Sequence, residues 1–179
     1  MRRLAMFLVV LALLTACQLS ASPVTPQSYG GAAPGPSVTL APYTGARVGP
    51  VGIYPMAITP GAIDPRVTQS TIATTICVSG YTMGVRSVSE AEKNAVYAEY
   101  RTTNTPGANE VDHLVSLELG GSNDIANLWP EPYSPPPGAH EKDKTENYLH
   151  AEVCAGRMTL ADAQTAIRGD WYSYWLQIH

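Results

Sequence analysis

The chain has 179 residues, a formal charge of −4, 15% charged residues and 45% hydrophobic residues. Its length favours a single domain, and its apolar runs stay short of the roughly 18 residues that span a bilayer, which excludes a polytopic membrane protein. The acidic balance argues against a protein that holds nucleic acid mainly by a positive field.

The first 16 residues have the pattern of an export signal. Arg2 and Arg3 form a short positive segment, and Leu4–Leu14 is apolar over the length of a signal-peptide core. Leu14-Thr15-Ala16-Cys17 resembles the lipobox of bacterial lipoproteins, which implies cleavage before Cys17 and acylation of that residue. Several acyl chains on one residue anchor a protein stably. We therefore expect a signal peptide over 1–16 and a lipid-anchored protein of the cell envelope, on the outer-membrane or periplasmic side in a Gram-negative cell; a secretory signal with an incidental cysteine is the alternative.

Residues 17–60 are rich in Pro, Gly, Ser, Thr and Ala and sustain no apolar period of two or 3.6 residues. Such a segment buries too little apolar surface to offset its ordering entropy, so we predict a disordered tether between membrane and domain. The folded domain is expected over 61–179, which at roughly 120 residues is long enough for one modest core.

The first part of this domain is predicted to contain strands and then a helix. Val67–Val78 is rich in β-branched residues and predicts one or two strands, which Tyr81–Val85 continues after a turn. Ser89 and Glu92 form a capping-box pattern, which predicts a helix from there to about Tyr100.

The middle of the domain is predicted to be a strand, a loop and a short returning strand. Residues 111–119 have the pattern of a strand that ends in a loop, and Asn127–Trp129 has the pattern of a strand that returns. The prolines between Pro130 and Pro137 are expected to exclude regular structure up to Gly138.

Two helices are predicted to close the domain. The first runs over about 139–155 and stops at Gly156, a residue type that favours helix termination. The second begins at the capping pattern of Thr159 and ends near Arg168–Gly169. The predicted elements together make a mixed α+β domain.

Two cysteines remain besides the predicted lipid anchor. Outside the cytoplasm an even pair favours a disulfide, so we expect Cys77 to be joined to Cys154. Two buried thiols are the alternative.

Residues 110–130 concentrate the groups that carry chemistry. His113 can accept a proton near neutral pH, and the neighbouring carboxylate of Asp112 can hold a divalent cation. Adjacent residues of a regular strand point to opposite faces. Asp112 and His113 therefore share one site only if the strand ends or bends there.

The series Asp112-His113-Leu114, Gly120-Gly121 and Asn127-Leu128 resembles the signature of the HNH endonucleases, also called His-Me finger nucleases. It is most similar to small exported bacterial HNH-like proteins, which share a DHL…LELGG…NLWPE core followed by a KD…EN helix. The match covers residues 110–150. The resemblance implies an α+β fold with a ββα-metal core, in which two short antiparallel strands carry the site, a helix packs across them and further helices flank them.

The resemblance also implies a role for each site residue. His113 would be the general base that takes a proton from the attacking water, and Asn127 would hold the hairpin loop and the ring of His113. Asp112 would bind one divalent metal ion, Mg²⁺, Mn²⁺ or Zn²⁺, with His140 at the start of the helix as a second ligand. Lys144 would contact a substrate phosphate. The chain lacks paired Cys-x-x-Cys motifs, so no structural zinc is expected.

Each role has a structural alternative. Asp112 also suits a cap or a salt bridge, His113 a structural hydrogen bond, and His140 a solvated position at the start of a helix. Glu118 and Glu131 are interpreted as local hydrogen-bonding residues rather than metal ligands.

The expected function is metal-dependent hydrolysis of DNA or RNA phosphodiesters at the cell envelope. Residues 110–147 contain eight acidic and two basic residues, so binding to nucleic acid is expected to be transient and weakly specific. The membrane is the other expected partner, through Cys17, and no protein partner is predicted. The alternatives are a non-catalytic envelope lipoprotein that uses the HNH-like scaffold for binding or structure, and a hydrolase of another envelope polymer.

Overall fold

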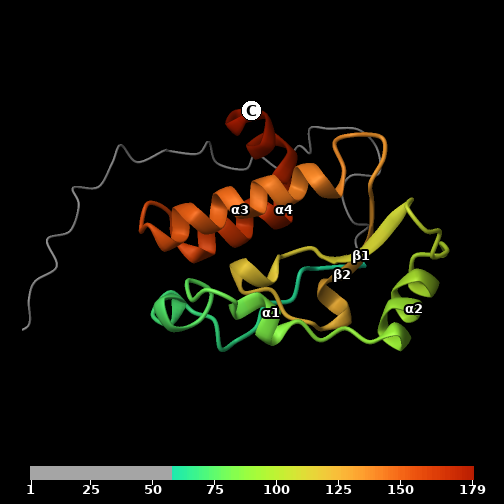
Figure 1. Ribbon diagram of the computed structural model, residues 1–179, viewed down its shortest axis with the longest axis horizontal. Coiled ribbons are helices and arrows are strands. Elements are labelled where there is room, and N and C mark those ends of the chain that lie inside the picture. The colour runs from blue at the N-terminus through green and yellow to red at the C-terminus, as the bar shows by residue number, and fades with distance from the viewer. Residues whose placement is uncertain (1–57) are drawn as a thin grey trace, which may run out of the picture. The chain divides into compact units, whose positions relative to one another are not determined.

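The computed structural model describes residues 58–179 (Figure 1). The predicted signal peptide, Cys17 and nearly all of the predicted tether over 17–60 lie outside the described residues. Within 58–179, no helix combines the length and the apolarity that crossing a membrane requires.

The described chain is an α+β domain in which helices surround one two-stranded antiparallel sheet. In Figure 1 the two long helices, α3 and α4, lie together on one side, with the hairpin β1–β2 and the shorter helices on the other. The elements are, in chain order, η1 (Ile72–Thr74), α1 (Tyr81–Val85), α2 (Glu90–Glu99), β1 (Asn109–His113), η2 (Leu117–Leu119), η3 (Ile125–Asn127), β2 (Leu128–Pro132), α3 (Ala139–Cys154) and α4 (Leu160–Ile178).

The core lies where α3 and α4 cover the loop between the two strands. Trp171 and Ile167 of α4, Leu149 of α3 and Leu119 of the loop are each fully buried. Burying a large apolar side chain contributes roughly 1.5–3 kcal/mol, so this contact between the helices and the loop is a main source of the domain's stability. It also fixes the loop that follows β1.

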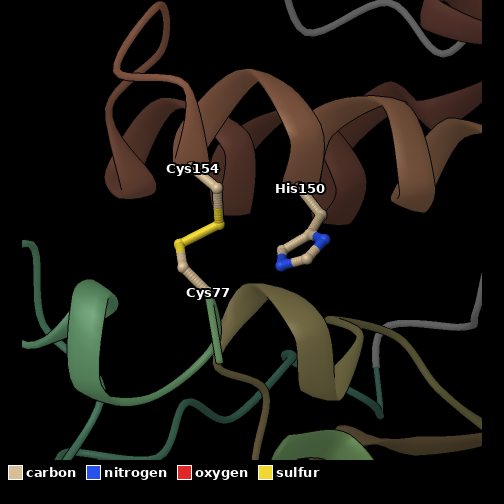
Figure 2. A group of neighbouring side chains, drawn as sticks. All are labelled: Cys77, His150 and Cys154. Carbon is tan, nitrogen blue, oxygen red and sulfur yellow. A yellow bond between two sulfur atoms is a disulfide. The ribbon is translucent and has the colours of Figure 1, made fainter. Parts of the chain in front are cut away.

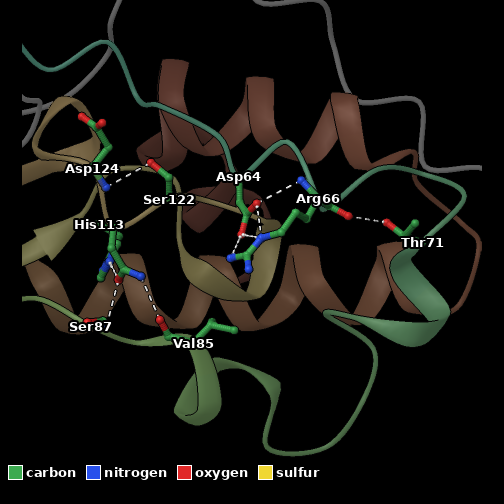
Figure 3. Close-up of polar contacts among 9 residues, drawn as sticks. Asp64, Arg66, Thr71, Val85, Ser87, His113, Ser122 and Asp124 are labelled. Carbon is green, nitrogen blue, oxygen red and sulfur yellow. Dashed lines mark hydrogen bonds and ion pairs between the residues drawn. The ribbon is translucent and has the colours of Figure 1, made fainter.

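The predicted strands over 67–78 and 81–85 are wrong. The first segment is a series of turns around η1, and the second is the short helix α1. Threonine hydroxyls compete with strand pairing there: Thr71 Oγ1 donates to Arg66 O at 2.9 Å, and Thr75 Oγ1 donates to Thr71 O at 2.7 Å. Side chains that bond to nearby backbone groups favour turns over a sheet ladder, and Asp64 holds the start of the segment through a paired contact with Arg66 (Figure 3).

The prediction that Pro130 and Pro132 exclude regular structure is also wrong, because both lie within β2. Tyr133 N donates to Ala108 O at 3.0 Å, and in an antiparallel pair such ladder bonds involve every second residue. Both prolines therefore stand at the alternate positions, where no N–H is needed. A two-stranded sheet accepts proline there because both of its strands are edges.

Most of the predicted helix ends agree with the structure. Ser89 and Glu92 form a reciprocal capping box at the start of α2, and α3 stops just before Gly156, whose φ of +71° suits glycine. The predicted end near Gly169 is wrong, because α4 continues to Ile178. Asp170 interrupts its helical angles, so the glycine marks a kink between two helical parts, and the aromatic second part still folds onto the molecule.

The predicted disulfide is confirmed: Cys77 and Cys154 are joined across 77 positions of sequence (Figure 2). The bridge ties the turns before α1 to the last residue of α3. By loop-closure entropy, a crosslink of this span stabilises the folded state by roughly 4 kcal/mol.

Candidate functional site

The site lies at the end of β1, where the chain leaves the sheet. Asn127 closes the loop that follows, and its side chain is fully buried. Its Oδ1 accepts from Val115 N at 2.9 Å, while its Nδ2 donates to Val115 O at 2.9 Å and to Ser122 O at 2.8 Å. These hydrogen bonds of the amide stay within the loop, and the side chain that contacts the ring of His113 is that of Asn123 instead.

The double glycine permits this closure. A Cβ on Gly121 would lie 1.7 Å from Val115 O and 2.7 Å from Asn127 Nδ2. Gly120 has a φ of +79°, in the left-handed region that glycine adopts without strain. The glycine pair is therefore required by the close approach of the loop's two sides.

His113 is the last residue of β1, and only 2% of its surface is exposed. Its Nε2 lies 3.1 Å from Asn123 Oδ1. Asn123 is held by the end of α1 and the linker that follows it: its Nδ2 donates to Val85 O at 2.8 Å, and its Oδ1 accepts from Ser87 N at 3.2 Å (Figure 3). Within residues 58–179, the Nδ1 of His113 has no hydrogen-bond partner.

Burial is the main influence on the protonation of His113 and lowers its pKa. The charge of Asp112 and the contact with Asn123 oppose this shift, whereas the charges of Arg86 and Lys142 add to it. The net result is a lowered pKa, so the imidazole is neutral at pH 7. A neutral ring is the form that can accept a proton.

Asp112 is engaged by a lysine that comes from α3. The side chain of Lys142 is completely buried, and its Nζ donates to Asp112 Oδ2 at 2.7 Å and to His113 O at 2.9 Å. The same ammonium contacts the carboxylate of Glu146 and lies 3.4 Å from Glu131 Oε2. One buried ammonium therefore contacts two buried carboxyl groups and one partly buried carboxylate. We call this group the Lys142 cluster: Asp112, Glu131, Lys142 and Glu146.

The Lys142 cluster divides its protons unevenly. Burial by itself would raise the pKa of Asp112, but the charge of Lys142 and the hydrogen bonds with Glu131 and Lys142 together outweigh burial and lower the value to about 2. Burial raises the pKa of Glu146 to about 8 and that of Glu131 well above its ordinary value. Burial by itself would lower the pKa of Lys142, but the neighbouring carboxyl groups outweigh burial and raise that pKa. Asp112 is therefore ionised at neutral pH beside Lys142, whereas folding favours the protonated forms of both glutamates.

The remaining predicted residues lie at the exposed start of α3. The ring of His140 packs against Tyr133 at 5.2 Å between centroids, and Lys144 reaches Glu141 at 3.9 Å. Burial and the charge of Asp112 raise the pKa of Asp143 in the same turn of α3, and the charges of Lys142 and His140 oppose that rise. The structure thus brings Asp112, His113 and Asn127 together, and it leaves His140 and Lys144 among other neighbours.

Sequence reasoning missed three residues of the site. Asn123 contacts His113, Lys142 contacts Asp112, and the charge of Arg86 lowers the pKa of both His113 and Asp143. Asn123 stands only two residues after the glycine pair, a position that could have drawn attention to it. Lys142 and Arg86 gave no signal, because a basic residue on a helix or in a linker is usually solvated.

A second group of potential ligands lies apart from the hairpin. Cys77, His150 and Cys154 offer ligand atoms within 4.8 Å of one another, a spacing that could hold a metal ion (Figure 2). The two sulfurs are bonded to each other, and His150 Nε2 lies 2.8 Å from Ile76 O. Thiolates ligate metals only when they are free, so this cluster is a metal site only for the reduced protein.

No family model, curated protein or solved structure matches this chain. Its chemistry is therefore inferred from the arrangement of its own side chains.

Proposed function

We propose that this protein is a metal-dependent nuclease of the HNH, or His-Me finger, type, which hydrolyses phosphodiester bonds of DNA or RNA with little sequence specificity. The observation that carries the proposal is the environment of His113. It is a buried, neutral imidazole at the end of a strand, and one of its ring nitrogens lacks a partner among residues 58–179. An unpaired buried acceptor is costly for stability alone, and such groups cluster at functional sites.

The proposed reaction begins with His113. The neutral ring takes a proton from a water molecule, whose oxygen then attacks phosphorus and displaces the leaving oxygen of the phosphodiester. Asp112 carries the adjacent negative charge, which stabilises the imidazolium formed in this step. Lys142 keeps Asp112 ionised and also binds His113 O, so that the base and its neighbour keep their positions.

Asp112, His140 and Asp143 are the residues that would hold a divalent cation beside the base, although within residues 58–179 their ligand atoms do not form one close group. Asp112, His140 and Asp143 offer oxygen and imidazole donors suited to Mg²⁺, Mn²⁺ or Zn²⁺, and Asp143 interacts electrostatically with both other residues. Asp143 was not among the ligands expected from the sequence. When bound, such an ion would stabilise the negative charge of the pentavalent phosphorus and of the leaving oxygen.

Two cations support binding of a phosphate at this site. The charge of Arg86 acts on His113 and Asp143, and Lys144 is 54% exposed at the start of α3. A guanidinium binds phosphate oxygens through a fork of N–H groups. Acidic residues outnumber basic ones around the site, so we expect nucleic acid to bind briefly and its affinity to fall as salt is added.

We place this activity outside the cytoplasm, with the protein anchored through Cys17. The disulfide supports an oxidising compartment, because such bonds are rare in the cytosol. Mass spectrometry of the protein purified from its host's membranes tests the anchor. An acylated N-terminal Cys17 is expected, and an unmodified chain that still begins at Met1 would contradict it.

The deciding experiment is plasmid nicking by the full chain with Mg²⁺, Mn²⁺, Zn²⁺ or EDTA. Wild-type protein should cleave with at least one metal and lose that activity in EDTA. His113→Ala should abolish cleavage, while His179→Ala, which removes an exposed histidine near the end of α4, should retain it. Equal cleavage by the two variants would remove His113 from the mechanism.

One observation favours a second function, that of a non-catalytic envelope scaffold. Lys142 already neutralises Asp112 through a contact of 2.7 Å, so the carboxylate has less need of a metal. In that case the folded protein would cleave nothing with any of the metals. Calorimetry would also detect no Mg²⁺ or Mn²⁺ binding that Asp112→Asn removes.

A further inference from the structure

The contact between Asn123 and His113 defines which ring nitrogen acts as the base. We propose that Asn123 is a positioning residue that holds His113 in the tautomer with its proton on Nε2, so that the Nδ1 lone pair is the acceptor. The tautomer follows from the contacts alone, and the role of Nδ1 as the base rests on the proposed function.

The orientation of the Asn123 amide is fixed by two backbone groups. Its Nδ2 donates to Val85 O at 2.8 Å, and its Oδ1 accepts from Ser87 N at 3.2 Å (Figure 3). Turning the amide over would set two acceptors against each other at Val85 and two donors against each other at Ser87. The oxygen must therefore face His113, because the network allows one assignment of the amide.

The hydrogen bond then determines the tautomer. Asn123 Oδ1 has only lone pairs to offer, so the Nε2 of His113, 3.1 Å away, must donate. A neutral imidazole carries one proton, which leaves Nδ1 with its lone pair. That atom has no hydrogen-bond partner among the described residues, so nothing in this part of the chain competes for it.

The charged groups around the ring come from three elements. Asp112 of β1 favours the protonated ring, while Arg86 of the linker and Lys142 of α3 disfavour it. Arg86 lies between the two residues that hold Asn123. The same stretch of chain therefore holds Asn123 and carries a positive charge that acts on the ring of His113.

The test is nitrogen NMR of the full chain labelled with ¹⁵N-histidine, with the His113 signals assigned by His113→Gln. In wild type, Nε2 should show the shift of a protonated ring nitrogen and Nδ1 that of an unprotonated one. Asn123→Ala should reduce the preference for this tautomer on the order of fivefold, the worth of one hydrogen bond. Asn94→Ala removes an exposed asparagine of α2 and should leave the spectrum unchanged.

Asn123→Asp provides the conservative variant. Its carboxylate can still accept from Nε2, so the tautomer should be retained, and its charge should raise the pKa of His113 measured in the same spectra. A proton on Nδ1 in the wild type, or an unchanged tautomer ratio in a folded Asn123→Ala, would overturn the proposal. If Asn123→Ala fails to fold, the spectra of wild type and Asn123→Asp decide it.

Cleavage assays separate this proposal from the proposed function. If the protein is a nuclease, Asn123→Asp should move the acidic limb of the kcat profile to higher pH, and Asn94→Ala should not. A protein that shows the expected tautomer and cleaves nothing would retain the role of Asn123 and lose the nuclease.

Discussion

Lys142 Nζ donates to Asp112 Oδ2 across 2.7 Å, and this one contact joins the middle of the domain to its C-terminal half. The same ammonium donates to His113 O. The end of the hairpin, the candidate base and helix α3 therefore form one mechanical unit. The geometry of the site depends on a lysine 30 residues away in sequence.

Removing the charge of Lys142 should strongly lower the free energy of unfolding. Lys142→Met leaves the ionised carboxylate of Asp112 without its cation, and breaking a buried pair costs about 3–5 kcal/mol. Urea denaturation should show that loss in the free energy of unfolding. Lys93→Met, which breaks an exposed pair with Glu90, should cost under about 1 kcal/mol. Similar losses in the two variants would mean that the Lys142 cluster is not a unit.

Glu146 predicts an unusual dependence of stability on pH. Its pKa rises from 4.5 to about 8 in the folded protein, so folding favours its protonated form. The stability that this proton contributes is complete below pH 4.5 and is lost as the pH rises through 8. The free energy of unfolding should therefore fall between pH 5 and pH 8.5. Glu146→Gln should flatten this part of the curve, and an unchanged slope in that variant would assign it to another group.

The glycine pair offers a matched test of loop closure. In Gly121→Ala the new Cβ meets Val115 O at 1.7 Å, and the required shift should lower the free energy of unfolding by roughly 3 kcal/mol or more. Gly84 lies in α1 with nothing within 4 Å of an added Cβ. Gly84→Ala should be neutral or stabilise by up to about 1 kcal/mol, and calorimetric melting of both variants measures the contrast.

Arg86 should affect both substrate binding and the candidate base. Arg86→Ala removes a charge that lowers the pKa of His113, so that pKa should rise when followed by NMR. If the site binds a phosphate, the variant should also lose roughly tenfold in kcat/KM and show a salt dependence shallower by about one charge. Lys93→Ala serves as the control. An unaltered His113 titration would place the guanidinium away from the ring.

The sequence by itself determined the features that rest on local chemistry. The capping box of Ser89 and Glu92 predicted α2, and the residue types around Gly156 predicted the end of α3. The count of cysteines predicted the bridge from Cys77 to Cys154. The helix ends could be predicted because the interactions that set them act within a few residues. The disulfide could be predicted because each of the two cysteines has only the other as a partner.

Only the tertiary structure decided the rest. β-branched residues over 67–78 predicted strands, but the threonine hydroxyls found nearby carbonyl groups instead. Two prolines joined β2 because each falls where the ladder needs no N–H group. Lys142 and Asn123 became site residues because folding buried them against Asp112 and His113. Burial and long-range contact set the charge and orientation of these groups, and neither can be read from spacing along the chain.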